Sequence, residues 1–549
     1  MGNGMARGIK QITLKSRVII FSLWPGILGA LSLLLLIGST LAVLLRGSDA
    51  LLLINELRND SYIHRVAIFS IWQAVLSTVL SVGIAIPVAR AFARQQDFIF
   101  RDLLLKLLGL PVVTPIIVAI FGIIAVYGQS GLVRATLEAL GVSWNGNFYG
   151  LTGILVTHVF FNLPLAIRML VPAWERIPSE NWRLAGQLGM NTQQIFRWLE
   201  WPALTGSIPG VSAIIFLLCF SSFAVVLVLG GGPSATTIEV AIYQALRFQF
   251  DPAQAALLAM LQISICTIIV LILHRWIRVQ PVYNIFSVST NYRPDLISQG
   301  GRRFDLTLIY LTCSFVMLPL LAVIYYGLTG PILDVLLERT IWAATTRSII
   351  IAIASTIIAL LLSIALLTTS RELLVIHKNR GLSDLFYIIG SIVLVVSPIV
   401  VGTGLFLLLL PIGINFDAAM LVIILVNAAL VLPYIIRTVG PALLDAGLRY
   451  DKLCRNLAIN RWNRLRLVDW PIIRRPLSFA LGLSASLSLG DLGVAALFNS
   501  AGAITLPVLV YYQLSAYRFD EAAVTALLLI FICAMLFVII DKGLQKWHS

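Results

Sequence analysis

The sequence predicts an all-α integral membrane protein of about 12 transmembrane helices in two parallel six-helix repeats. Three observations predict this fold: long apolar runs, an uneven distribution of basic residues, and an internal repeat. Of the 549 residues, 59% are hydrophobic and 12% are charged, whereas soluble domains carry about 25% charged residues. A helix of about 20 apolar residues crosses the hydrocarbon core of a bilayer and pairs its own backbone polar groups there.

The apolar runs divide evenly between the two halves of the chain. In the first half the expected spans are residues 20–45, 66–89, 107–127, 149–171, 207–229 and 253–274. In the second half they are residues 305–327, 343–368, 386–411, 418–440, 478–497 and 521–541. The third and ninth runs contain Thr114-Pro115 and Ser397-Pro398. Because proline removes a helical hydrogen bond, kinks are expected there.

Basic residues separate by side when these runs are taken as alternating spans. With the N-terminus in the cytoplasm, 31 of the 39 Lys and Arg residues lie on cytoplasmic segments. Cytoplasmic loops of membrane proteins carry such an excess. Because omitting one helix would scramble this asymmetry, we expect twelve spans with both termini cytoplasmic. The same distribution accounts for the net charge of +14, so no nucleic-acid partner is expected.

A shift of 269 residues aligns the second half with the first. It pairs Leu163-Pro164 with Leu432-Pro433 and Tyr243-Gln244 with Tyr512-Gln513. Because each half has six spans, the repeats share one topology and should be related by an axis along the membrane normal. The expected domains are a first six-helix repeat at 1–274, a cytoplasmic linker at 275–304 and a second six-helix repeat at 305–549.

A cytoplasmic loop of one pattern occurs at the same place in both repeats. The first copy is Arg183-Leu-Ala185-Gly-Gln-Leu-Gly189, nine residues, then Leu199-Glu-Trp201-Pro202. The second copy is Lys452-Leu-Cys454-Arg-Asn-Leu-Ala458, nine residues, then Val468-Asp-Trp470-Pro471. A short helix that ends in a small residue can turn sharply and present one side to a groove of a partner. The proline can begin the following helix, where its missing N–H costs nothing.

This spacing resembles the cytoplasmic EAA loop of ABC-importer permeases, whose pattern is E-A-A, three residues, G, nine residues, I-x-L-P. Both copies keep the step of 13 residues from the glycine position to the proline. Arg183 or Lys452 stands where the family has glutamate, Ala458 replaces the second glycine, and tryptophan precedes each proline. The resemblance implies that these coupling loops bind two copies of an ABC ATPase subunit. It also implies a periplasmic or extracellular solute-binding protein, and a place among the lipids of the bacterial inner (plasma) membrane.

The chain contains no G-x-x-x-x-G-K-[ST] loop for binding nucleotide phosphates. The resemblance therefore implies that the partner subunits use ATP and that this chain binds no cofactor. We expect a transport subunit and not an enzyme.

Within that superfamily the chain most resembles the fused thiamine and thiamine diphosphate permeases. The resemblance is carried by Gly230-Gly-Gly-Pro-Ser-Ala-Thr-Thr-Ile-Glu-Val, Ser488-Leu-Gly-Asp-Leu-Gly-Val and Ala522-Ala-Val-Thr-Ala-Leu527. It implies import of thiamine and/or its phosphates. Iron(III) or another small solute is the alternative within the superfamily. An ion-coupled secondary transporter is a further alternative, although residues 90–106 lack the loop motif G-x-x-x-D-R/K-x-G-R/K-R/K of such carriers.

Asp491 is a carboxylate within the eleventh apolar run. An ionisable residue at membrane depth is costly and by default indicates a functional site. Thiamine carries a thiazolium cation, so Asp491 is a candidate for the substrate path; a helix-terminus contact or a basic neighbour would make it structural instead. Its repeat mate is Ser222, so the halves would be inequivalent here. No metal site is expected, because the five cysteines lack ligand spacing. No catalytic site is expected either, because the spans contain no paired carboxylates, H-E-x-x-H motif or nucleophile constellation.

Overall fold

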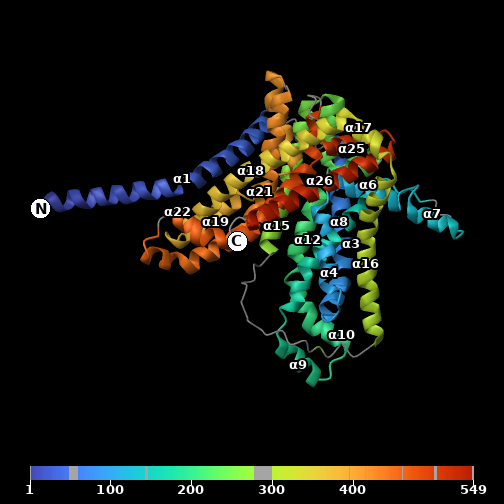
Figure 1. Ribbon diagram of the computed structural model, residues 1–549, viewed down its shortest axis with the longest axis horizontal. Coiled ribbons are helices and arrows are strands. Elements are labelled where there is room, and N and C mark those ends of the chain that lie inside the picture. Colours follow the sequence, from blue (N-terminus) through green and yellow to red (C-terminus); the bar gives the residue numbers. More distant parts are fainter. Residues whose placement is uncertain are drawn as a thin grey trace. The chain divides into compact units, whose positions relative to one another are not determined.

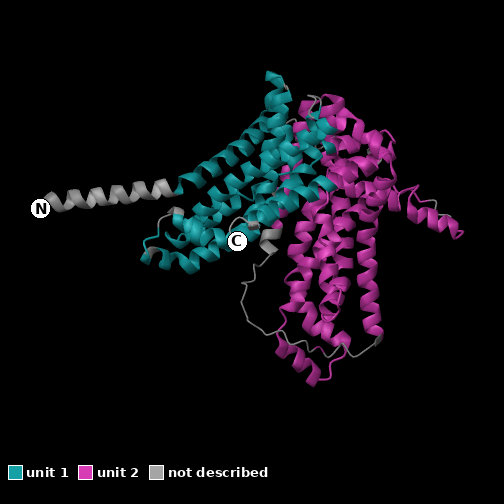
Figure 2. Cartoon of the chain, in the orientation of Figure 1, with its two compact units in different colours: residues 1–48, 342–506, 531–549 teal, residues 49–341, 507–530 magenta. Residues whose placement is uncertain are grey.

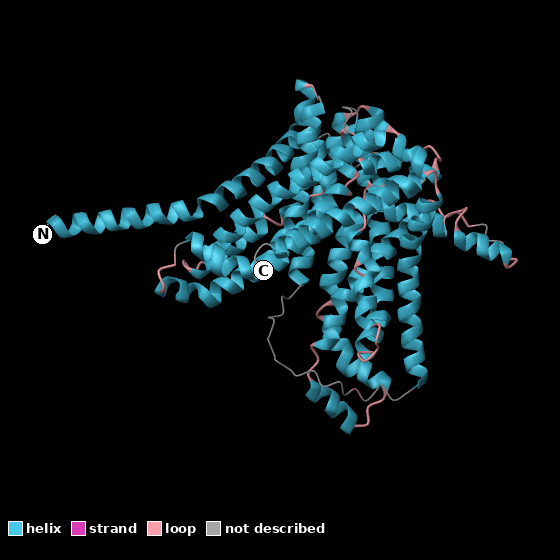
Figure 3. Ribbon diagram, viewed as in Figure 1, coloured by secondary structure: helices cyan, strands magenta, loops and turns pink. Residues whose placement is uncertain are grey.

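The computed structural model describes residues 2–47, 60–142, 146–230, 232–276, 293, 299–394, 396–413, 416–459, 461–499 and 504–546. In this part of the chain all regular secondary structure is helical (Figure 3). Ten of the described helices are long and apolar enough to cross a membrane. An eleventh candidate, Thr192–Thr205 with Ile208–Phe220, is bent by 55°. The predicted all-α membrane fold is therefore confirmed.

The count of twelve spans stays a prediction. The described residues of the ninth expected span are divided among the end of the helix Arg380–Ile389, the short helix Ile392–Leu394 and the apolar helix Pro398–Ile412. It begins at Pro398 because the residue before a proline is disfavoured in helical conformation, whereas the proline itself suits the first turn.

Two compact units make up the chain, and they do not coincide with the halves of the sequence (Figure 2). Unit 1 comprises residues 1–48, 342–506 and 531–549, and unit 2 comprises residues 49–341 and 507–530. The helix Gly2–Gly47 of the first half thus belongs to unit 1, which consists mainly of residues from the second half. The helix Gln299–Thr329 of the second half belongs to unit 2, which consists mainly of residues from the first half. The domains predicted at 1–274, 275–304 and 305–549 rest on the duplication of sequence and stay a prediction.

Figure 1 labels many of the helices and colours all of them along the chain. Those mainly in unit 2 are α3 (Ser61–Arg94), α4 (Arg101–Leu107), α5 (Leu110–Val113), α6 (Ile116–Tyr127), α7 (Leu132–Ala139), α8 (Leu151–Glu175), α9 (Ser179–Gln187), α10 (Thr192–Ile195), η1 (Phe196–Glu200), α11 (Trp201–Thr205), α12 (Ile208–Phe220), α13 (Ala224–Leu229), η2 (Pro233–Ala235), α14 (Ile238–Gln244), η3 (Ala245–Gln249), α15 (Pro252–Trp276), α16 (Gln299–Thr329), α17 (Ile332–Leu337) and α25 (Leu506–Ser515). Those mainly in unit 1 are α1 (Gly2–Gly47), α18 (Arg339–Val375), α19 (Arg380–Ile389), η5 (Ile392–Leu394), α20 (Pro398–Leu409), η6 (Leu410–Ile412), α21 (Phe416–Asn456), α22 (Arg461–Arg464), η7 (Leu465–Asp469), α23 (Trp470–Leu489), α24 (Gly493–Leu497) and α26 (Phe519–Lys546).

Close contacts hold the first long helix of each half in its unit. In unit 1 the Gly26 N–H of α1 donates to Thr369 Oγ1 at 3.1 Å, and Leu33 joins the apolar core formed by α18, α21 and α23. In unit 2 helix α16 packs against α6 and α3. A Cβ on Gly122 of α6 would collide with the carbonyl of Pro319 on α16. Small residues permit such close approach of helices in membranes.

Candidate functional site

Each predicted coupling loop contains a helix end in the left-handed conformation. Gly189 follows α9 with φ 63°, and Ala458 follows the end of α21 with φ 47°. The next N–H closes back on Ala185 O at 3.0 Å in the first loop and on Cys454 O at 2.9 Å in the second. A side chain is strained at this φ and glycine is not. The glycine position of the motif is therefore a backbone requirement, and Ala458 meets it at a cost.

A π-helical turn precedes each Trp-Pro pair. The Trp201 N–H donates to Phe196 O across η1, and the Trp470 N–H donates to Leu465 O across η7. Pro202 and Pro471 then lie in the first turn of α11 and α23. A proline cannot donate, and its ring crowds the carbonyl four residues earlier, so a wider turn just before it accommodates the ring.

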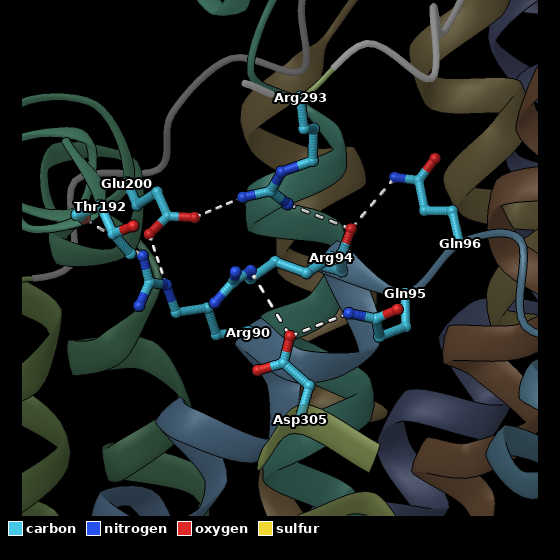
Figure 4. A network of polar contacts seen from close by, with 9 residues as sticks. Arg90, Arg94, Gln95, Gln96, Thr192, Glu200, Arg293 and Asp305 are labelled. Carbon is cyan, nitrogen blue, oxygen red and sulfur yellow. Dashed lines mark hydrogen bonds and ion pairs between the residues drawn. The ribbon is translucent and has the colours of Figure 1, made fainter. Parts of the chain in front are cut away.

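The residue before Trp-Pro is a buried acid in both loops. The Glu200 side chain is 0% exposed and accepts a bond from Arg90 Nε of α3 at 2.6 Å (Figure 4). The Asp469 side chain is 3% exposed and accepts a bond from Arg371 Nη1 of α18 at 2.7 Å. Because a buried carboxylate needs a charged or donating partner, each pair fixes its loop to the second helix of its half. Sequence analysis did not single out these two acids, although the 269-residue shift pairs Glu200 with Asp469, each within a basic loop.

The buried acid has a second cation nearby, and this cation differs between the loops. In the first loop it is Arg293, whose Nη2 lies 2.5 Å from the carboxylate and whose guanidinium lies 4.1 Å from the Trp182 ring centroid. In the second it is Arg464, whose Nη1 lies 2.7 Å from Asp451 and whose Nε lies 3.9 Å from the buried acid. Trp182 and Asp451 are repeat mates. The same loop geometry is thus held by different side chains.

Each coupling loop exposes two leucines at its helix: Leu184 (54% exposed) and Leu188 (63%) in the first loop, and Leu453 (51%) and Leu457 (63%) in the second. The small residues Ala185 and Cys454 of the motif are buried, whereas Arg183 and Lys452 are exposed. The leucines are separated by four residues and share one helix face. The motif does not include these leucines, although the 269-residue shift pairs Leu184 with Leu453 and Leu188 with Leu457 in the sequence.

The fifth and eleventh expected spans are interrupted at repeat-related positions. Ser222 lies in the break between α12 and α13, and Asp491 lies in the break between α23 and α24. Asp491 Oδ1 accepts a bond from the Gly493 N–H at 3.3 Å. Its Oδ2 is buried and has no hydrogen-bond partner among the described residues. A helix-terminus contact therefore accounts for one carboxylate oxygen and not for the other.

In each half a buried amide side chain donates to a backbone carbonyl just before the helix break. Gln73 Nε2 donates to Cys219 O at 2.9 Å, and Asn427 Nδ2 donates to Ser488 O at 3.2 Å. Cys219 and Ser488 are repeat mates just before the breaks. A helix break frees backbone carbonyls, which are costly at membrane depth unless they find donors. Both halves therefore provide for an interrupted span at this position.

The five cysteines are buried free thiols. Within the described ranges no three His, Cys, Asp or Glu side chains are grouped so as to hold a metal ion.

Relatives resemble the chain over most of its length. The thiamine transport system permease protein ThiP of Brucella abortus (strain 2308) is 42% identical over 485 residues, which cover 88% of each protein. Its namesake in Escherichia coli (strain K12) is 42% identical over 88% of this chain and 89% of its own. Its namesake in Haemophilus influenzae is 36% identical over the same shares. No protein-family model matches the chain.

A more distant relative, the molybdenum transport system permease protein ModB of Mycobacterium bovis, is 25% identical over 204 residues, which cover 37% of this chain and 76% of that protein. Together with the membrane fold, the nearer matches confirm the resemblance seen in the sequence. The chain belongs to the family of thiamine transport system permease proteins.

Proposed function

We propose that this chain is the membrane-spanning permease subunit of an ATP-driven ABC importer that carries thiamine and/or its phosphates across a bacterial inner membrane. The observation that carries this proposal is the identity of 36% to 42% with thiamine transport system permease proteins over 88% of the chain. Both termini would lie in the cytoplasm, as the distribution of basic residues favours.

The partners follow from the two coupling loops. Each loop would bind one copy of an ABC ATPase subunit, which would use the ATP, and a solute-binding protein would deliver the substrate from outside. Apolar anchors four residues apart, such as Leu184 and Leu188, suit a helix that lies in a groove of a partner. The buried acids Glu200 and Asp469 link the loops to α3 and α18. Movement of a docked loop would therefore be passed to a long helix and not absorbed within the loop.

The substrate path would include the two helix breaks. Interrupted helices at membrane depth form the substrate sites of many transporters, because their free backbone groups can face a ligand. The carboxylate of Asp491 keeps one oxygen without a hydrogen-bond partner among the described residues, and it suits the thiazolium cation. Ser222 supplies a neutral hydroxyl at the repeat-related place.

The test is uptake of labelled thiamine into proteoliposomes that hold the chain with its co-purified ATPase. We expect uptake that needs ATP and the solute-binding protein. Unlabelled thiamine and its phosphates should compete, whereas iron(III) and molybdate should not. Uptake that proceeds without an ATPase and is abolished by a protonophore would contradict the proposal and favour a secondary transporter.

A further inference from the structure

One residue of the segment between the repeats, Arg293, contacts the first coupling loop. Its side chain is 6% exposed, and its Nη2 lies 2.5 Å from Glu200 Oε1 (Figure 4). Its Nη1 donates to Ala93 O at 3.1 Å, at the C-terminal end of α3. The guanidinium also lies over the ring of Trp182 in α9. The Arg293 guanidinium therefore contacts α9 at the start of the loop, Glu200 near its end, and the backbone of α3.

The same end of α3 also receives the start of α16. Asp305 accepts a bond from Gln95 Nε2 at 3.0 Å and lies 3.5 Å from Arg94 Nε. Arg293, from the segment between the repeats, and Asp305, at the start of α16, thus contact neighbouring residues at the C-terminal end of α3 (Figure 4). This end of α3 is therefore held by Arg293 and by the start of α16.

The second coupling loop has its corresponding cation within itself. Arg464 belongs to the loop whose acids, Asp451 and Asp469, it approaches. The repeat mate of Asp451 is Trp182, which offers an aromatic face to a cation where the second loop offers a carboxylate. The repeat mate of Arg464 is the apolar Ile195, which is buried. The first loop thus lacks the internal ion pair of the second loop and has a site for a cation from elsewhere in the chain.

We propose that Arg293 is a positioning residue that sets the first coupling loop, so that this loop, unlike the second, depends on the segment that joins the repeats. Removing the guanidinium leaves Arg90 as a partner of Glu200 and takes away the contact that Arg293 makes between Trp182 of α9 and Ala93 of α3. The helix that carries Leu184 and Leu188 then loses its fixed orientation. The consequence for transport rests on the proposed function, whereas the positioning itself does not.

The experiment compares spin labels at two matched positions, L188C and L457C, which replace leucines of equal exposure (63%). The native cysteines are buried, and a sample without an introduced cysteine gives their background signal. We expect R293Q to shift the label at 188 toward the mobile spectrum and to leave the label at 457 unchanged. R464Q should do the reverse. R293K keeps a charge for Glu200 and Trp182 and should restore part of the immobile signal at 188.

Two outcomes would overturn the proposal: no change at position 188 in R293Q, or an equal change at both positions. In proteoliposomes with the ATPase bound, R293Q should lower the thiamine taken up per ATP hydrolysed, and R293K should recover part of it. An unchanged ratio in R293Q would overturn the consequence for transport. The labels are measured on the chain alone, so failure to bind any ATPase would contradict the proposed function and not the role of Arg293.

Discussion

The two coupling loops share a backbone but not the side chains that hold it. Both have a left-handed residue after the helix, a π-helical turn, and a buried acid before Trp-Pro. In the first loop Pro178 separates α8 from α9, whereas its repeat mate Gly447 lies inside the continuous helix α21. Proline disfavours helical conformation before it, and glycine imposes no such break. The comparison teaches that the spacing of the motif specifies the loop geometry, and that its side chains can differ.

The same comparison explains the departures from the EAA pattern. Arg183 and Lys452 are exposed, so the backbone geometry does not demand glutamate there. Ala185 and Cys454 are buried at 3% exposure and must be small. Ala458 is the one departure with a conformational cost, because its φ is positive.

The largest expected effect concerns the buried acids. Glu200→Gln leaves the buried guanidinium of Arg293 and the half-buried one of Arg90 without their carboxylate, and we expect a loss of about 3–5 kcal/mol in the free energy of unfolding. Asp469→Asn should cost less, because its second cation is 3.9 Å away and has Asp451 as another partner. Thermal unfolding of the purified chain in detergent measures both. Glu138→Gln, in an exposed pair with Arg134, is the control and should change stability by less than about 1 kcal/mol. Equal, small losses for all three variants would contradict burial as the cause.

The next effect concerns the exposed leucines. Leu188→Asp and Leu457→Asp place a charge on each proposed docking face, and each should weaken binding of the ATPase by about 2 kcal/mol, or about 30-fold. Binding is measured by co-purification and titration with the ATPase. Leu140→Asp, at a leucine 78% exposed outside the loops, is the control. Normal ATPase affinity in both loop variants would remove these faces from the interface.

The third prediction concerns the two helix breaks, where one half has Asp491 and the other has Ser222, and its expected effect is smaller than that of the leucine variants. Asp491→Asn removes a charge with little change of size, and uptake of thiamine should fall by about tenfold, equivalent to about 1.4 kcal/mol. Ser222→Ala should have a weaker effect because no charge is lost. Uptake in proteoliposomes, with assembly checked by co-purified ATPase, measures both. Wild-type uptake by the Asp491→Asn variant would exclude the carboxylate from the substrate path.

The smallest effect concerns the left-handed residues. Gly189→Ala should destabilise the chain by about 1 kcal/mol, and Ala458→Gly should stabilise it by a similar amount. A Cβ at Gly189 would meet nothing within 4 Å, so conformational strain is the cause tested. Denaturation of both variants under one condition provides the comparison. A shift of the same sign in the two variants would show that the helix ends are not equivalent.

The sequence predicted the membrane fold, because apolar runs are a local property. The motif spacing predicted two loops of like geometry for the same reason, and their coupling role stays a prediction. It could not predict that α1 and α16 pack into the units formed mainly by the other half, since both are apolar and suit either unit. It could not predict Arg293 either, because the residue is 93 positions from Glu200 and belongs to no pattern. The leucine pairs could have been found from the repeat, but their exposure could not be predicted, because only packing determines which side of a short helix is buried.

Cross-linking tests the central claim, that both loops carry the ATPase contacts, most directly. The L188C and L457C variants, each assembled with the ATPase in proteoliposomes, would be treated with a short thiol-to-amine cross-linker. We predict that each position cross-links to an ATPase subunit and that the cross-link stops thiamine uptake. Active uptake with no cross-link from either position would contradict the account.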